Sequence, residues 1–383
     1  MKKTTAPDGG AVPAPPADGV IPGAGPTGRP TGQPQGRPTE WPTAWAAARS
    51  GERPHGHLVD GSGGDRRQAE RGGGLPDRPH EQGTGQPSAE RATLRLREAR
   101  APGRTEEPPR YAPEWLELRE GADAAARARD LLDPLRIRLA NLPRRADGLV
   151  VHDLGCGTGS MGRWLAPLLD GAQHWVLHDR DPYLLHFAAV ASPRSAADGS
   201  GVTVETRRGD LARLTPDALV GASLVTASAL LDVLTPQEVA GLAAACAGAG
   251  CAALLTLSVA GRVEVTPEHP LDAEIAEAFN DHQRRTGLLG PDAVTAAADA
   301  FAEHGATVLA HPSPWHLGPD ESALTAPWLR GWVGAAVEQR PELREPAARY
   351  LDERLAACAA GRLRVVVHHT DLLVLCRPTG GDS

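Results

Sequence analysis

The stretch from residue 149 to residue 159 constrains the fold more than any other part of the sequence. Residues 149–154 form a mostly apolar run of strand length, and a loop with glycine at positions 155, 157 and 159 follows at once. Glycines between a strand end and a helix start allow a tight turn and let backbone N–H groups come close to a ligand. The stretch therefore predicts a strand–loop–helix unit with a ligand site at the loop, without choosing the ligand.

Strand-like and helix-like segments alternate along the rest of the chain. Helices are expected over residues 111–141 and residues 271–285. A third helix is expected to begin at a capping box at residues 235–238 and to end near Gly248. Strands are expected at residues 149–154, 174–178, 202–206, 222–228, 252–259, 306–310 and 363–375. Such alternation with short connections is typical of an α/β fold with a doubly wound, mostly parallel, Rossmann-like sheet.

Residues 1–110 have a different composition from the remainder. About a third of them are Gly or Pro, and large apolar side chains are sparse. Such a segment cannot bury enough apolar surface to offset the ~1–2 kcal/mol of backbone entropy that each ordered residue costs. We therefore predict a disordered Pro/Gly-rich tail over residues 1–110, dispensable or an over-extended start, with a docking arm as the alternative. The folded domain is expected over residues 111–378.

Charge and cysteine content exclude several classes of protein. Residues 111–383 carry 24 Lys and Arg against 35 Asp and Glu, so their net charge is negative. A protein that binds the phosphate backbone of a nucleic acid usually has a positive net charge, so this class is not expected. The five cysteines are an odd number without C-x-x-C spacing, so neither a disulfide framework nor a cysteine zinc site is expected. With no apolar run near ~18 residues and no secretory signal, we expect a cytoplasmic protein without a membrane partner.

Asp153 distinguishes the glycine loop from a simple dinucleotide fingerprint. Residues 157–162 do match G-x-G-x-x-G, but a carboxylate two positions before the first glycine would repel a pyrophosphate. The pattern D-x-G-x-G-x-G resembles motif I of the class I S-adenosylmethionine-dependent methyltransferases. The resemblance implies that Asp153 orients the amino group of the ligand and that Gly155, Gly157 and Gly159 pack under it.

Further residues match the same family at suitable spacing. Asp179 ends the second strand, where the family places an acid that accepts hydrogen bonds from both ribose hydroxyls, although a dinucleotide dehydrogenase also has an acid there; Asp181 is a weaker candidate. Asp210 resembles the acid that accepts from the adenine amino group, with the Leu211 N–H at a ring nitrogen. The implied cofactor contacts are Asp153, Gly155, Cys156, Gly157, Gly159, Asp179, Arg180, Asp210, Leu211 and Ala227.

The acceptor side is expected where the chain leaves the fifth strand, over residues 262–270, because ligands of open α/β sheets bind outside the carboxyl ends of the strands. His282 falls on the apolar stripe of the helix over residues 271–285, and His269 lies in the loop before it. Each is a candidate general base, since imidazole titrates near neutrality. A buried structural histidine is the alternative reading of each.

The end of the chain predicts a helical insertion and a last strand. Residues 313–361 are expected to be helical, with Trp328 and Trp332 either in a core or in a lid over the substrate. Residues 363–375 would be the antiparallel seventh strand that marks the family. Adjacent strand residues point to opposite faces, so His368 and His369 are not expected to share a metal, and no metal site is predicted.

The function predicted from these motifs is S-adenosylmethionine-dependent methyl transfer to a small molecule, at oxygen or nitrogen rather than carbon. One alternative is a catalytically silent S-adenosylmethionine-binding partner or sensor. Two others are an RNA methyltransferase and an NAD-dependent oxidoreductase. The Asn/Asp-Pro-Pro-aromatic tetrapeptide of base-amino methyltransferases is absent after the fourth strand, and no Lys follows position 3 to supply a Tyr-x-x-x-Lys pair. The acceptor and the oligomeric state are not predicted.

Overall fold

The computed structural model describes residues 112–143, 148–209 and 214–377. The strands there are β1 (Leu149–Leu154), β2 (Gln173–Asp179), β3 (Val202–Arg208), β4 (Leu224–Ser228), β5 (Ala252–Thr266), β6 (Thr307–Pro312), β7 (Trp315–Leu317) and β8 (Arg364–Leu375). The α-helices there are α1 (Pro113–Ala126), α2 (Leu132–Ala140), α3 (Ser160–Leu165), α4 (Pro182–Val190), α5 (Pro236–Ala249), α6 (Asp272–Gln283), α7 (Ala293–Glu303), α8 (Ser322–Gln339) and α9 (Arg344–Ala359).

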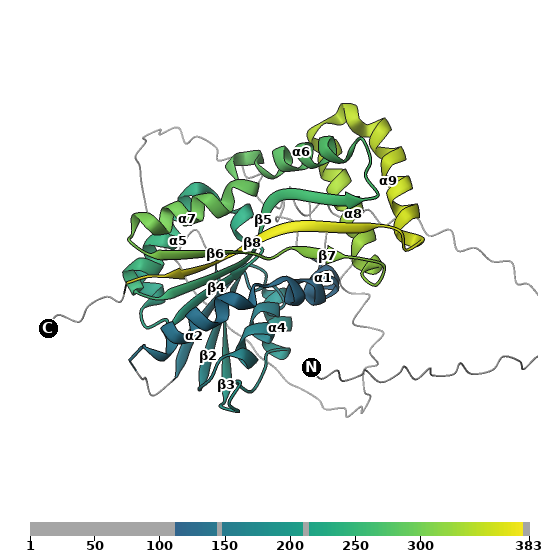
Figure 1. The fold of residues 1–383 in the computed structure, drawn as a ribbon. Helices are drawn as coiled ribbons and strands as arrows, with labels where there is room; N and C mark the ends of the chain where they lie inside the picture. The colour runs from purple at the N-terminus through teal and green to yellow at the C-terminus, as the bar shows by residue number, and fades with distance from the viewer. Residues whose placement is uncertain (1–111, 144–147, 210–213, 378–383) are drawn as a thin grey trace, which may run out of the picture. The chain divides into compact units, whose positions relative to one another are not determined.

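All these strands belong to one sheet, in the order β3-β2-β1-β4-β5-β8-β6, with β7 paired to β8 (Figure 1). The pairs from β3 to β5 are parallel, and β8 runs antiparallel to β5, β6 and β7. The sheet is therefore the Rossmann-like, mostly parallel sheet that was predicted, with its antiparallel last strand. The short β7 is an eighth strand that the sequence analysis did not predict.

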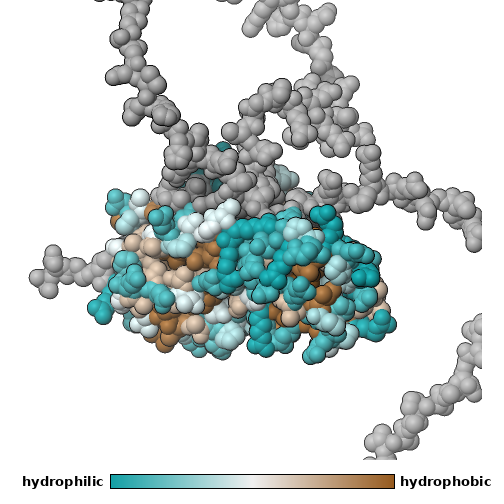
Figure 2. Space-filling view, turned by 90° about the horizontal axis from the view of Figure 1, so that it is seen from above, coloured by the Kyte–Doolittle hydropathy of each residue, from teal (hydrophilic) through white to brown (hydrophobic). Residues whose placement is uncertain are grey.

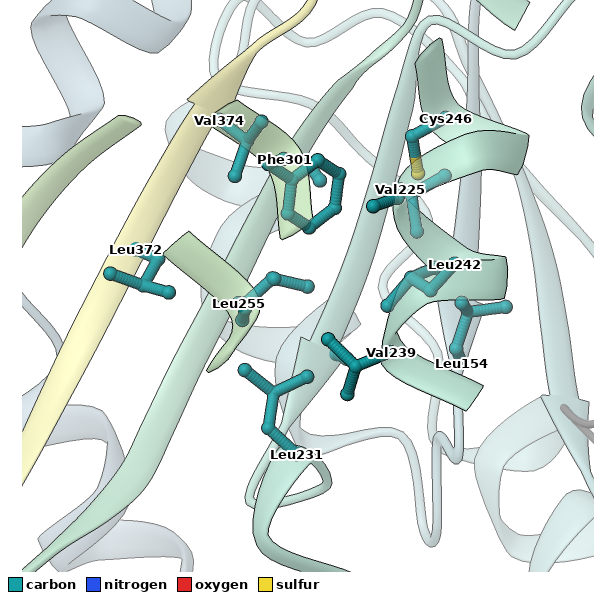
Figure 3. Close-up of a cluster of buried hydrophobic side chains, with 14 of the residues drawn as sticks. Leu154, Val225, Leu231, Val239, Leu242, Cys246, Leu255, Phe301, Leu372 and Val374 are labelled. Carbon is teal, nitrogen blue, oxygen red and sulfur yellow. The ribbon is translucent and has the colours of Figure 1, made fainter. Parts of the chain in front are cut away.

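Helices cover both faces of the sheet, because successive side chains of a strand point to opposite sides. Ala253 and Leu255 of β5 pack in a cluster with Phe301 of α7 and the apolar side of α5 (Figure 3). Ala252 and Leu254, one residue out of step, pack in a second cluster with side chains of α2, α3 and α4. The capping box that was predicted at residues 235–238 is present at the start of α5.

The strands β5 and β8 are longer than the other strands of the sheet, and their paired ends extend toward α6, α8 and α9 (Figure 1). Sequence analysis expected the fifth strand to end at residue 259 and a loop to follow, but β5 continues to Thr266, which pairs with Arg364. This extension, with β7, supports a third apolar cluster. Trp328 and Trp332 lie in that cluster, 7% and 2% exposed, and they also line the cavity described below.

Two predicted helical segments differ from the structure. The single helix expected over residues 111–141 is two helices, because the backbone is extended at Arg127 and Ala128 between α1 and α2. The insertion expected over residues 313–361 begins with β7 before α8 and α9 follow. The predicted tail over residues 1–110 lies outside the described residues.

The surface of the described residues gives no sign of a membrane-spanning helix. Within the described ranges, no helix is both long and apolar enough to cross a bilayer. On the face shown in Figure 2, hydrophilic and hydrophobic residues are interspersed.

The Asp371 carboxylate joins three segments that are far apart in the sequence. It is 1% exposed and accepts hydrogen bonds from the Ala128 N–H (2.8 Å), the Leu257 N–H (2.7 Å) and the Ser313 hydroxyl (2.5 Å). Leu257 has a φ of +57°, in the left-handed region, at a register shift of β5. The carboxylate therefore fixes the link between α1 and α2, the bulge of β5 and the turn before β7.

We expect Asp371→Ala to lower the free energy of unfolding by about 3 kcal/mol or more, because three buried donors lose their acceptor. Urea denaturation of the full chain measures this change. Asp371→Asn keeps one acceptor oxygen, so its free energy of unfolding should lie between those of Asp371→Ala and the wild type. The exposed Asp320→Asn is the matched control and should change stability by less than about 0.5 kcal/mol. A loss below about 1 kcal/mol for Asp371→Ala would contradict this role.

Candidate functional site

A cavity of about 370 Å³ opens at the carboxyl ends of β1, β2 and β4. One end is formed by the glycine loop after β1 and by the last residues of β2 and β3. The other end is formed by β7, β8, α8 and the bulged part of β5, and residues of α1 lie along the cavity between the two ends. This is the edge of an open α/β sheet at which ligands bind.

The glycine loop is held against β2 and needs its glycines. The Cys156 N–H donates to the His178 carbonyl oxygen at 2.9 Å. Gly155 and Gly157 have φ values of +61° and +55°, and a Cβ on Gly155 would lie 2.9 Å from the Leu230 Cδ1. A side chain at either position would strain the backbone, so the loop conformation follows from the sequence.

Asp153 carries the least satisfied carboxylate oxygen of the loop region. The residue is 1% exposed, and its Oδ1 accepts a hydrogen bond from the Thr226 hydroxyl at 2.8 Å. Its Oδ2 has no protein partner. Burial raises the pKa of Asp153 to about 7, while the Thr226 hydroxyl and the charge of Arg127 act in the opposite direction. A buried acceptor without a partner in a cavity wall is suited to a donor on a ligand, above all a cationic one.

Asp179, at the end of β2, faces the same cavity. Its Oδ2 accepts from the Gly157 N–H and its Oδ1 from the Asp181 N–H, both at 2.9 Å. Burial raises the pKa of Asp179, and these two backbone bonds oppose the shift. Each carboxylate oxygen has a second lone pair. The side chain is thus fixed in orientation and can still accept two hydrogen bonds from ligand hydroxyls.

A buried ion pair in α1 connects the helix to β7. The Arg119 guanidinium donates to both oxygens of Asp123, at 2.9 and 3.1 Å. The Trp315 indole N–H donates to Asp123 Oδ1 at 3.0 Å, and the Arg119 guanidinium lies 5.0 Å from the centroid of the Trp315 ring. Arg119, Asp123 and Trp315 all line the cavity.

Arg127, just after α1, links the helix to the glycine loop. Its Nη2 donates to the Ser160 hydroxyl at 3.2 Å and to the Ser228 hydroxyl at 3.1 Å, at the start of α3 and the end of β4. The residue is 2% exposed, and burial lowers its pKa. Its charge favours the ionised form of Asp153. Arg119, Asp123 and Arg127 thus connect the two ends of the cavity.

The far end of the cavity is aromatic. The rings of Trp328 and Trp332 are stacked, with centroids 5.1 Å apart, and the His369 ring lies 5.3 Å from that of Trp315. Burial lowers the pKa of His369 to about 4, so its imidazole is neutral at physiological pH. Asp232, after β4, is 4% exposed, and burial raises its pKa to about 6.

The structure brings most of the predicted cofactor residues together. The predicted residues that line the cavity are Asp153, Gly155, Cys156, Gly157, Asp179 and Arg180. Gly159 does not line it but starts α3, where a Cβ would lie 3.2 Å from the Ala188 Cα. Ala227 faces the apolar core on the α5 side, and the cavity begins one residue later at Ser228. Asp210 and Leu211 lie outside the described residues.

Neither predicted general base lines the cavity. The His282 Nε2 lies 3.0 Å from the Glu338 Oε2, between α6 and α8, and its side chain is 1% exposed. The Nδ1 of His269 accepts the Leu271 N–H at 3.0 Å, and its ring contacts Tyr350. Both histidines are engaged in local structure, His282 with α8 and His269 with α9, whereas Phe279 of α6 does line the cavity.

Several residues of the cavity were missed by sequence reasoning. Leu116, Arg119 and Asp123 lie on one helical face at spacings of three and four, a pattern that could have marked α1 as part of the site. Asp232, after β4, also lines the cavity and was not singled out in the sequence. His369 was considered only as a metal ligand. Within the described residues, no group of three or more His, Cys, Asp or Glu side chains is arranged to hold a metal ion.

Comparisons with known proteins give matches among solved structures alone. No protein-family model matches the chain, and no curated protein matches it in sequence. The chain is similar to the cyclopropane synthase MmaA2 of Mycobacterium tuberculosis, with 13% identity over 64% of this chain and 82% of that one, at a TM-score of 0.35. It is also similar to a methyltransferase of Thiobacillus denitrificans solved with S-adenosylhomocysteine, with 17% identity, 69% and 99% coverage and a TM-score of 0.34.

A third match is a methyltransferase of Geobacter sulfurreducens, also solved with S-adenosylhomocysteine. It shares 16% identity with this chain over 68% of this chain and 98% of that one, at a TM-score of 0.33. Matches at these identities and TM-scores carry no weight for activity, which depends on the residues of the site.

The raised pKa of Asp153 has a measurable effect on stability. The folded chain holds this proton more tightly than the unfolded chain, whose carboxyl titrates near 3.8, so stability falls as pH rises through the folded pKa of about 7. Asp153→Asn keeps an oxygen for Thr226 and removes the titration. We expect its stability relative to wild type to rise by about 2–3 kcal/mol between pH 5 and pH 8 in urea denaturation. A difference that stays constant with pH would contradict the raised pKa.

Proposed function

We propose that this chain transfers a methyl group from S-adenosylmethionine to a small-molecule acceptor. The observation that carries the proposal is the buried, unpartnered Oδ2 of Asp153, which belongs to a side chain lining the cavity directly above the glycine loop. A carboxylate here suits the α-ammonium group of the methionine moiety, because burying an uncompensated charge is costly and a cationic ligand offsets that cost.

The other residues at this end of the cavity fit the same cofactor. The Gly155 and Gly157 turn lets a ligand approach the backbone closely, and Asp179 has acceptor capacity for two ribose hydroxyls. Asp210 and Leu211 remain predicted contacts to the adenine ring. When bound, S-adenosylmethionine would supply a methyl group activated by its sulfonium: a nucleophile bonds to the methyl carbon as the C–S bond breaks and the thioether leaves. The protein's part is to hold nucleophile and methyl group in line and close together.

The rival functions fit the site less well. An NAD-dependent oxidoreductase would place a pyrophosphate at the glycine loop, where the Asp153 and Asp179 carboxylates repel it. An RNA substrate would meet a cavity whose far end is apolar and aromatic. A silent binding protein would not need that far end at all. The five cysteines are buried as free thiols, which favours a reducing, cytoplasmic setting.

We also propose that the methyltransferase domain spans residues 111–378, the bounds predicted from the sequence. The described residues from α1 to β8 contribute to the cavity or to the clusters that support it. The acceptor is expected to be a small molecule, because side chains of α1, β7 and α8 line a cavity of only about 370 Å³.

Calorimetric titration of the full chain with S-adenosylhomocysteine, S-adenosylmethionine, NAD and NADP tests the cofactor. We expect micromolar binding of the two S-adenosyl ligands and at least tenfold weaker binding to Asp153→Ala and Asp153→Asn, because a charged hydrogen bond of about 1.5–3 kcal/mol is lost. The matched carboxylate control, Asp320→Asn, should bind as the wild type does.

Binding of NAD in preference to the S-adenosyl ligands would overturn the proposal. Equal affinity of S-adenosylhomocysteine for the wild type and both Asp153 variants would remove the assignment of that carboxylate. Tight cofactor binding without methyl transfer to a broad panel of acceptors would favour the silent sensor instead.

A further inference from the structure

We propose that the far end of the cavity is an acceptor subsite for an amine carried on a flat, apolar body. The juxtaposition that carries this is a pair of unpartnered polar atoms, on Asp232 and His369, in the wall of the same cavity that holds the stacked rings of Trp328 and Trp332. The inference rests on the proposed function and specifies the class of acceptor that the same site takes.

Two buried polar atoms in the wall of this cavity have no protein partner. They are the Oδ1 of Asp232 and the Nδ1 of His369, on side chains that are 4% and 5% exposed and line the cavity. Buried polar atoms in folded proteins are nearly always hydrogen-bonded, so two such atoms in the wall of one cavity indicate donors on a ligand. A carboxylate can only accept, and a hydroxyl supplies one donor where an amine supplies two or three.

The two acceptors lie around the same side chain. The charge of Arg119 lowers the pKa of Asp232 and also that of His369, so both groups are within electrostatic reach of one guanidinium. Arg119 is itself neutralised by its bidentate pair with Asp123. Asp232 keeps an uncompensated formal charge, which favours an ammonium over a neutral alcohol or an acid. Its carboxylate can also take the proton that the nitrogen must lose before it accepts a methyl group.

His369 can accept a hydrogen bond at Nδ1. Burial lowers its pKa to about 4 and keeps its imidazole neutral. A neutral imidazole has one donor nitrogen and one acceptor nitrogen, so the tautomer with its proton on Nε2 offers Nδ1 to a donor on a ligand. His368, on the opposite face of β8, pairs with Glu264 instead.

The apolar side chains of the cavity wall indicate that the body of the ligand is flat and apolar. Trp328 and Trp332 present stacked indoles, and Val263 of β5 and Val367 of β8 add apolar surface. Aromatic faces bind flat apolar groups and also attract ammonium groups. The Trp332 indole N–H has no partner, so the ligand body can carry one acceptor as well.

Matched pairs of small probes test the head group separately from the body. The full chain, saturated with S-adenosylhomocysteine, is titrated calorimetrically with benzylamine against benzyl alcohol, 2-phenylethylamine against 2-phenylethanol, and tryptamine against tryptophol. We expect an amine to bind at least tenfold more tightly than its alcohol in one or more pairs. In Asp232→Asn this preference should fall to less than threefold, while Asp320→Asn keeps it.

His369 is tested by two variants. Asn places an acceptor oxygen near the position of Nδ1, so His369→Asn should retain the amine preference, whereas His369→Phe should lose it. The affinity for S-adenosylhomocysteine, measured on every variant first, should change by less than about threefold and reports that the fold and the cofactor end are intact.

The outcomes separate this inference from the proposed function. Failure of the wild type to bind S-adenosylhomocysteine would overturn the function itself. Binding of S-adenosylhomocysteine without amine preference in any pair, including no binding of any probe, would overturn the amine subsite alone. A preference that survives both Asp232→Asn and His369→Phe would overturn it too, because the amine would then be recognised elsewhere.

Discussion

The arrangement of the cavity depends on one buried carboxylate, Asp371. Its two oxygens accept from the backbone of Ala128 and Leu257 and from the hydroxyl of Ser313. These donors belong to the end of the α1 region, the bulge of β5 and the turn before β7. No secondary structure connects these segments directly, so the carboxylate supplies the bonds that a continuous ladder would otherwise supply. The neighbouring strands then place His369 and Trp315 in the wall of the cavity.

The charges of α1 extend this organisation to the cofactor end. Arg127 reaches the Ser160 and Ser228 hydroxyls, while Arg119 and Asp123 reach Trp315. Buried charges of this kind contribute little net stability, because desolvation offsets most of their attraction. Their effect is positional: Arg119 and Asp123 hold α1 against Trp315, and Arg127 ties the end of the helix to the segment after the glycine loop. Asp153 and Asp232 keep unpartnered oxygens, and Arg127 keeps unpartnered Nε and Nη1 atoms. A buried polar atom without a hydrogen-bond partner lowers the free energy of unfolding. A hydrogen bond from a bound ligand offsets this loss.

The course of β5 explains why neither predicted base lines the cavity. Sequence analysis ended the fifth strand at residue 259 and looked for substrate contacts in the segment after it. In the structure, β5 continues to Thr266 by pairing with β8, and this moves His269 and His282 away from the sheet edge. Thr266 pairs with Arg364, about a hundred residues later in the chain. The apolar pattern of β8 would be the same whether or not β5 continued alongside it. Local periodicity therefore cannot give the length of β5.

The sequence by itself determined the Rossmann-like fold and the residues at the glycine-loop end of the cavity. Asp153 and Asp179 lie at the carboxyl ends of β1 and β2, and Gly155 lies in the turn after β1, so local segments of the chain place all three. Only the tertiary structure decided the opposite end of the cavity, because Asp123, Asp232, Trp315 and His369 come from four distant segments. They meet through the antiparallel packing of β8 and the placement of α1, and each is an ordinary residue in its own local context. Long-range contacts carry no spacing signal in a single sequence, whereas a glycine turn does.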